Sequence, residues 1–211
     1  TVNGGVTPYT YLWSNSATTQ DLNAITAGTY SVRVTDANSC IVRDTTIITE
    51  PTLLVSSKTK VDVKCKNANN GSIDLTVSGG VTPYAYLWSN SATTEDLTAL
   101  PAGTYTVRIT DANSCIRRDT VIITEPALLT SSKTKVDVKC KNGNDGSIDL
   151  TVNGGTTPYT YLWSNSATTQ DLTSITAGTY SVRVTDANSC IVRDTTIITE
   201  PTLLISSKTK V

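Results

Sequence analysis

Five cysteines recur at two fixed places along the chain and are the residues best suited to covalent chemistry. Three of them end the stretch TDANSC, at residues 35–40, 110–115 and 185–190, and two end the stretch VDVKC, at 61–65 and 136–140. In a secreted protein, an odd number of cysteines indicates either a free reactive thiol or a partner outside the segment. Thiol reactivity and disulfide formation are therefore the two kinds of chemistry to weigh.

The other side chains offer little for catalysis. The chain has no histidine, which excludes a Ser-His-Asp triad, a Cys-His pair and imidazole metal ligands. Asp74, Glu95 and Asp96 could supply paired carboxylates for glycoside hydrolysis, but a small repeated domain offers little cleft around them. We therefore expect no enzymatic activity and no cofactor.

Composition also limits the partners. The formal net charge is −1 and charged residues make up 17% of the chain, so no field of either sign favours nucleic acid or an anionic membrane surface. No run of about 18 apolar residues occurs, so we expect no membrane span in this segment. The chain opens on TVNGG and not on a basic and then apolar leader, so a secretion signal is expected outside the segment.

A repeat of 75 residues organises the chain. Trp13, Trp88 and Trp163 are spaced by it, as are the cysteines of each type. This period is too long for a solenoid coil and fits small autonomous domains in tandem. Prolines mark the boundaries. The predicted units are a truncated repeat at 1–50, whole repeats at 51–125 and 126–200, and the first strand of a further repeat at 201–211.

Short runs of alternating polar and apolar residues predict strands within each repeat. Thr, Ser, Val and Ile are abundant while Phe and Met are absent, a composition typical of strands with a hydroxyl-rich outer face. Six or seven short strands with frequent turn signals favour an all-β sandwich of the immunoglobulin type. In the middle copy the predicted strands lie at 51–65, 72–78, 84–88, 95–100, 105–109 and 115–125.

The middle copy also carries recognisable motifs at residues 71–115: GSI, GG-x-x-P-Y-x-Y-x-W-S, ATTEDL and AGTY-x-V-x-[VI]-TDA, ending in the cysteine. These motifs, present along nearly the whole chain, resemble the SprB-type repeat of Bacteroidota cell-surface adhesins. The resemblance implies tandem immunoglobulin/PKD-like domains in a very long protein exported by type 9 secretion, the namesake being a mobile adhesin of gliding motility. The family often has C-N-G at the first cysteine, where this chain has CKN. This difference weakens the prediction of a metal-binding loop by analogy with the family members that are rich in Asn and Gly.

This resemblance implies that the segment is extracellular, at the cell surface, and forms part of a stalk or filament. Short junctions and disulfides would give it stiffness and reach. The expected partners are neighbouring repeats of the same chain and other copies in a fibre, besides an unidentified surface glycan or protein ligand. The alternative is a multivalent glycan- or protein-binding module with one site in each repeat.

Two disulfide pairings compete: Cys65 with Cys115 inside one domain, or Cys40 with Cys65 across a junction. The first closes a loop of 50 residues, a constraint that stabilises by about 4 kcal/mol in the chain-entropy model. Four predicted strands separate Cys65 from Cys115, and an even number brings both to the same end of a sandwich. We therefore expect Cys65–Cys115 and Cys140–Cys190, with Cys40 paired outside the segment. Free buried thiols are a further alternative.

Aromatic and lysine side chains recur in each repeat. Tyr84, Tyr86, Trp88 and Tyr105 could form a sugar-stacking platform. The favoured interpretation is that Trp88 packs in the core and Tyr105 ties its strand to a neighbouring turn, as the buried tryptophan and tyrosine corner of such sandwiches do. The lysines at 58, 60 and 64 alternate along a strand, and we expect them on a solvated edge that discourages aggregation.

Two further patterns give weaker candidates. Asn142, Asn144, Asp145 and Asp149 could offer oxygen ligands to calcium, but Asn70 replaces Asp145 in the other copy, which favours a plain hairpin turn and no metal site. The triplets at 44–46, 119–121 and 194–196 resemble the short Asp-Thr-x O-glycosylation signal of Bacteroidota, the alternative being an ordinary Thr-rich strand. The candidate O-glycosylation residues are Thr45, Thr120 and Thr195.

Overall fold

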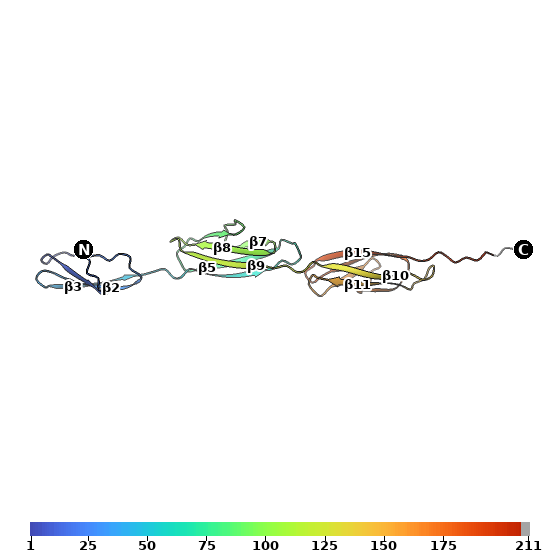
Figure 1. The fold of residues 1–211 in the computed structure, drawn as a ribbon, viewed down its shortest axis with the longest axis horizontal. Helices are drawn as coiled ribbons and strands as arrows, with labels where there is room; N and C mark the ends of the chain where they lie inside the picture. Colours follow the sequence, from blue (N-terminus) through green and yellow to red (C-terminus); the bar gives the residue numbers. More distant parts are fainter. Residues whose placement is uncertain (208–211) are drawn as a thin grey trace.

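Three β units follow one another along the chain. The structure, a computed structural model, describes residues 1–207. Figure 1 shows the units in a row along the long axis, with the N-terminal unit at one end and the C-terminal extension at the other. All fifteen regular elements in the described residues are strands, which confirms the predicted all-β class. Residues 1–207 contain no helix long and apolar enough to cross a membrane.

The middle domain is a sandwich of two three-stranded sheets, with strand orders β4-β5-β7 and β6-β8-β9. All neighbouring strands in both sheets are antiparallel. This is the immunoglobulin arrangement in which strands A, B and E face strands C, F and G. The first sheet contains β4 (Val55–Val61), β5 (Gly71–Ser78) and β7 (Leu97–Leu100), and the second contains β6 (Ala85–Trp88), β8 (Gly103–Thr110) and β9 (Ile116–Ile123).

The third domain repeats this arrangement, and the N-terminal unit contains only the second sheet. Residues 201–207 form no strand, and the rest of the strand predicted at 201–211 lies outside the described residues. In the third domain β10 (Thr130–Val136), β11 (Gly146–Asn153) and β13 (Leu172–Ile175) face β12 (Thr160–Trp163), β14 (Gly178–Thr185) and β15 (Ile191–Ile198). The N-terminal sheet contains β1 (Thr10–Trp13), β2 (Gly28–Thr35) and β3 (Ile41–Ile48).

Alternating apolar residues from both sheets fill the core of each complete sandwich. In β5, Ile73 and Leu75 are buried and Asp74 between them is exposed. From the facing sheet, Val107 and Ile109 of β8 pack into the same cluster. Successive side chains on a strand point to opposite faces, so the alternation in the sequence translates directly into these two layers.

Trp88 and Tyr105 occupy the places predicted for them. Trp88 is 2% exposed, and its indole N–H donates to the carbonyl oxygen of Thr94 at 2.9 Å. The Tyr105 hydroxyl donates to the carbonyl of Pro101 at 3.0 Å, four residues upstream, as in a tyrosine corner. Both rings are therefore structural, and the sugar-stacking interpretation fails for them.

Lys58 and Lys60 are exposed on β4, an edge strand of its sheet, as predicted, and their ammonium groups also bond to β9. The Lys58 ammonium donates to the Asp119 carboxylate and to the carbonyl of Thr120, and Lys60 donates to the carbonyl of Ile122 at 2.6 Å. Because β4 lies along the edge of β9, the lysine side chains connect the two sheets along one side of the sandwich. The sequence alternation could not reveal this, since it depends on which strand edges meet. We call this contact the lysine seam; the third domain repeats it through Lys133 and Lys135.

The seam holds its carboxylates in the charged form. Burial would raise the pKa of the Asp119 carboxyl, but hydrogen bonds from Lys58, the Thr120 amide and Ser56 outweigh it and keep the pKa below its ordinary value. Beyond the end of β9, Glu125 accepts from Lys66 and from the Asn67 amide, and these bonds lower its pKa as well. Folding therefore favours the charged form of both carboxylates over the protonated form.

Acid should weaken the complete sandwiches in a defined range. A pKa lowered by folding contributes stability that is complete above the unfolded value near 4 and is lost as the pH falls through the lower folded value. We expect the melting temperature to be level between about pH 7 and pH 5 and to fall below about pH 4, measured by circular dichroism.

The paired substitutions Asp119→Asn and Asp194→Asn should destabilise each domain at pH 7 by about 1–2 kcal/mol and weaken the acid dependence. Glu95→Gln is the matched control, because Gln20 and Gln170 occupy the equivalent positions in the other copies. The same acid dependence in the double variant and in the control would contradict a role for the seam.

Candidate functional site at the junction between domains

A disulfide joins the middle domain to the third domain. It links Cys65, in the loop after β4, to Cys190, in the loop before β15, with their Cα atoms 5.7 Å apart. Beside it, the side-chain amide of Asn188 donates to the carbonyl of Lys64 at 3.0 Å. The two cysteine-bearing stretches of the sequence therefore meet across a domain junction.

The predicted pairing of Cys65 with Cys115 and of Cys140 with Cys190 is therefore wrong. Four strands do separate Cys65 from Cys115, but the chain crosses the sandwich five times between them. β7 pairs antiparallel with β5, so it runs in the same direction as β6, and residues 89–96 carry the chain back without forming a strand. An odd number of crossings leaves the two cysteines at opposite ends of the domain.

An aspartate holds the loop that presents Cys190. One oxygen of Asp186 accepts from the amides of Asn188 at 2.9 Å and of Cys190 at 2.8 Å, and the other accepts from the amide of Thr156 at 2.8 Å. Asp111 makes the same bonds in the middle domain, and those from the amides of Val81, Cys115 and Asn113 lower its pKa. The aspartate of TDANSC is thus the anchor of the cysteine loop.

The linker at this junction is held on both sides of Pro126. Before it, Glu125 is bound by Lys66 and by the Asn67 amide. After it, the amide of Gly155 donates to the carbonyl of Ala127 at 2.9 Å. At Gly154, with φ of +73°, an added Cβ would lie 2.0 Å from the carbonyl oxygen of Leu128, so only glycine fits.

Sequence reasoning missed these linker residues, although it contained signals for them. The Gly-Gly pair appeared only as part of a family motif, and the glutamate directly before each boundary proline was not considered. Their importance depends on contacts with loops about 30 or 60 residues distant, which no local pattern shows.

The remaining cysteines, Cys40, Cys115 and Cys140, are free and exposed. By the repeat, Cys140 corresponds to Cys65, while Cys40 and Cys115 correspond to Cys190. The structure therefore brings together one cysteine of each type and leaves the other three at equivalent places on the other domain ends.

The calcium candidates do not converge. Asp145 accepts from the Lys139 amide at 3.1 Å, Asn142 donates its own amide to Glu200, and Asp149 lies on β11 opposite Thr134. Asn70 accepts from the Lys64 amide at 3.0 Å, as Asp145 does in its own domain. One acceptor oxygen suffices for this bond, which explains why Asn and Asp interchange there. Among the described residues, no group of three or more Asp, Glu, Cys or His side chains could hold a metal.

The candidate glycosylation and catalytic residues are also separate from the junction. Thr45, Thr120 and Thr195 are exposed on β3, β9 and β15. Asp96 accepts from the amide of Leu75 at 2.9 Å and so supports β5. Glu95 lies beside Tyr86, where burial and this carboxylate raise the pKa of the tyrosine to about 12.

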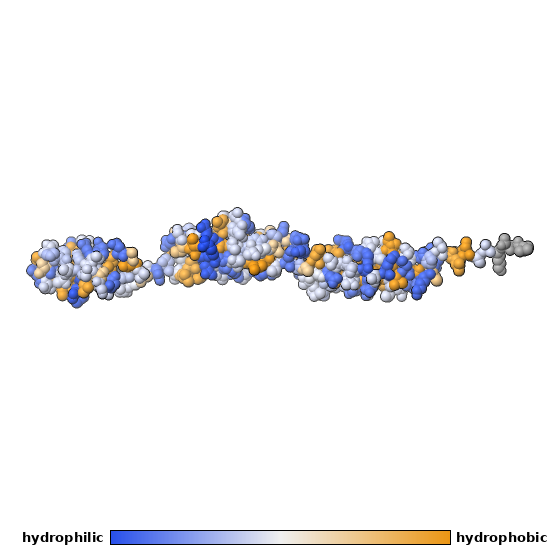
Figure 2. Space-filling model, viewed as in Figure 1, coloured by the Kyte–Doolittle hydropathy of each residue, from blue (hydrophilic) through white to orange (hydrophobic). Residues whose placement is uncertain are grey.

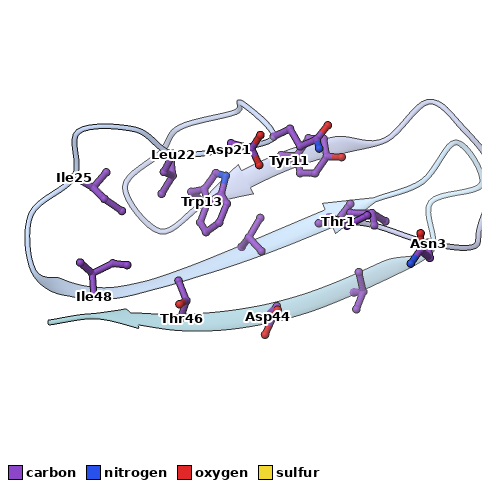
Figure 3. A pocket seen from close by; sticks show the side chains of 15 residues that line it. Thr1, Asn3, Tyr11, Trp13, Asp21, Leu22, Ile25, Asp44, Thr46 and Ile48 are labelled. Atoms are coloured by element: carbon purple, nitrogen blue, oxygen red, sulfur yellow. The ribbon is translucent and has the colours of Figure 1, made fainter.

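A hollow of about 470 Å³ on the N-terminal unit is an uncovered core. Figure 3 shows Trp13, Leu22, Ile25 and Ile48 around this hollow. Ile48 is 37% exposed, whereas its counterpart Ile123 is 2% exposed beneath the sheet β4-β5-β7. The hollow is thus the inner face of a lone sheet and does not indicate a ligand site.

Comparison with protein families agrees with the repeat. The SprB repeat family matches residues 57–93 and 132–168, one repeat length apart. The repeat is found in cell-surface proteins. No curated protein matches the chain.

Solved structures of immunoglobulin-domain proteins are similar in fold, at low sequence identity. The eight N-terminal domains of Down syndrome cell adhesion molecule match at a TM-score of 0.46 and 11% identity, covering 92% of this chain and 33% of that one. Extracellular domains 3–5 of Drosophila OTK match at a TM-score of 0.35 and 12% identity, covering 83% of this chain and 72% of that one. Murine CEACAM1b matches at a TM-score of 0.29 and 14% identity, covering 70% of this chain and 100% of that one. This chain spans about a third of the first of these proteins. The chain therefore contains two matches to the SprB repeat, and its complete domains have the immunoglobulin-like arrangement of strands.

Proposed function

We propose that the chain is a non-catalytic stalk segment of a very long exported adhesin, which serves surface attachment or gliding motility after type 9 secretion. The observation that carries this proposal is the locked junction. A disulfide, an amide contact and a linker held on both sides of one proline restrain the middle domain against the third. Such a junction suits a rod that transmits force at the cell surface.

The disulfide also changes what a pulling force can extend. Cys65 lies just after β4 and Cys190 just before β15, so the bond bridges 125 residues that include most of both domains. Force applied at the chain ends passes through the bond. Only β4, β15 and the segments outside them can then lengthen, even when a domain loses its packing.

Single-molecule pulling tests this role directly. In a chain with Cys40, Cys115 and Cys140 replaced by serine, the oxidised molecule should extend by roughly 410–450 Å less than the reduced one, since extended residues span about 3.3–3.6 Å each. Further replacement of Cys65 and Cys190 by serine should give the full extension without reductant. Equal lengths with and without reductant would contradict a force-bearing staple.

A second function, multivalent binding of acidic polysaccharide, is favoured by one feature of the outer sheet face. Arg108 of β8 stands directly opposite Arg118 of β9 and beside Leu87 of β6, which is 44% exposed. Like charges directly opposite each other destabilise a sheet, and neither arginine forms an ion pair within residues 1–207. An anionic group of a ligand would satisfy both guanidinium groups.

This arrangement recurs once in each unit. The equivalent arginine pairs are Arg183 with Arg193 and Arg33 with Arg43. On the face shown in Figure 2, hydrophobic residues form small separate patches along the three units. Repeated small sites suit weak contacts that add up along a long polymer.

Binding to polygalacturonate, measured by biolayer interferometry against neutral dextran, tests the second function. Arg108→Gln with Arg118→Gln should weaken binding by about tenfold, because the loss of one of three sites reduces avidity. Lys64→Gln with Lys139→Gln removes the same charge elsewhere and should leave binding within about twofold. Equal losses in both variants would show only a net-charge effect.

A further inference from the structure

The two ends of each complete domain carry different halves of the junction. One end presents the VDVKC loop, as the middle domain does with Cys65, and the other presents the TDANSC loop, as the third domain does with Cys190. The halves are unlike, so this interface is head-to-tail and can continue in both directions.

The unused halves are already folded for this contact. At the far end of the third domain, the Val138 amide donates to the carbonyl of Thr199 at 3.0 Å, as Val63 does to Thr124 at 2.9 Å. The Asn142 amide donates to Glu200, which repeats the bond of Asn67 to Glu125. The loop that carries Cys140 is therefore restrained as the loop of Cys65 is, and its thiol is free and exposed.

The opposite half is equally preformed in the N-terminal unit. Asp36 accepts from the amides of Asn38 at 2.9 Å and of Cys40 at 2.8 Å, the distances found for Asp186 in the bonded junction. Cys40 is also free and exposed. Two complementary half-sites are thus available at opposite ends of the row of units in Figure 1.

We propose that the end of a repeat bearing Cys140 binds the TDANSC loop of a further SprB repeat and forms with it the same disulfide that joins Cys65 to Cys190. The Lys139 carbonyl would accept from the asparagine of that loop, as Lys64 does from Asn188. This inference deepens the proposed stalk function and rests on it, because it names the partner of the junction.

The covalent step needs a two-electron oxidant. Two thiols lose their protons and two electrons as the sulfur–sulfur bond forms, and a small-molecule disulfide such as oxidised glutathione accepts them and becomes two thiols. In the cell a dithiol–disulfide oxidoreductase would take that place.

Repetition of this bond has a mechanical consequence. Cys140 lies inside the stretch between Cys65 and Cys190, so successive disulfides overlap. In a continuous array the shortest covalent path would contain only about 25 of every 150 residues, since each bond bridges 125. Disulfides closed within each 75-residue domain would leave twice that length extensible.

Mixing two variants of the whole chain tests the inference, both in a Cys115→Ser background. The first carries Cys40→Ser and keeps Cys140, and the second carries Cys140→Ser and keeps Cys40. In a glutathione redox buffer at millimolar protein concentration, the mixture should form covalent dimers containing one copy of each, as seen by intact mass spectrometry. Each variant alone should remain a monomer.

Symmetric dimers in either variant alone, at the same yield as in the mixture, would overturn the inference, and so would the absence of mixed dimers. Asn38→Ala in the second variant should lower the yield of mixed dimer several-fold without changing its melting temperature. Neither result bears on the pulling experiment, which depends on the bond between Cys65 and Cys190 within one chain. Failure of the inference and failure of the stalk function are therefore distinguishable.

Discussion

The direction of β7 determines where the cysteines of this protein can bond. Because β7 pairs with β5, it runs parallel to β6, and the chain must return between them without a strand. That extra crossing sends Cys65 and Cys115 to opposite ends of one domain. The TDANSC cysteine to which Cys65 is bonded lies on the next domain, and the disulfide becomes a feature of the junction.

The junction works because the polypeptide around it has little freedom left. Glu125 is bound by the loop that carries Cys65, and two residues after Pro126 the chain lies against Gly154. The disulfide constrains the unfolded chain as well, by about 5 kcal/mol in the entropy model for a loop of 125 residues. The same few residues therefore serve both the stability and the geometry of the junction.

The sequence predicted what depends on local pattern and missed what depends on how distant parts meet. Alternation and composition were enough for the all-β class, because a strand with one face inward shows it directly. The buried Trp88 and Tyr105 at the turn followed from the analogy with immunoglobulin sandwiches. The disulfide was mispaired because the segment 89–96 gives no strand signal and so was not counted as a crossing. The exposed position of the β4 lysines followed from alternation, but their bonds to β9 were missed because no pattern shows that β9 lies beside that edge. Of the five cysteines, the structure pairs two across a junction and leaves Cys40, Cys115 and Cys140 free.

Peptide mapping of the oxidised chain tests the central claim most directly. Trypsin releases identical peptides around Cys40 and Cys190, and around Cys65 and Cys140, so the measurement requires a chain with Cys40→Ser and Cys140→Ser. In that chain the account predicts that residues 65–66 are joined to residues 184–193, which contain Cys190. A bond from residues 65–66 to residues 109–117, which contain Cys115, would contradict it.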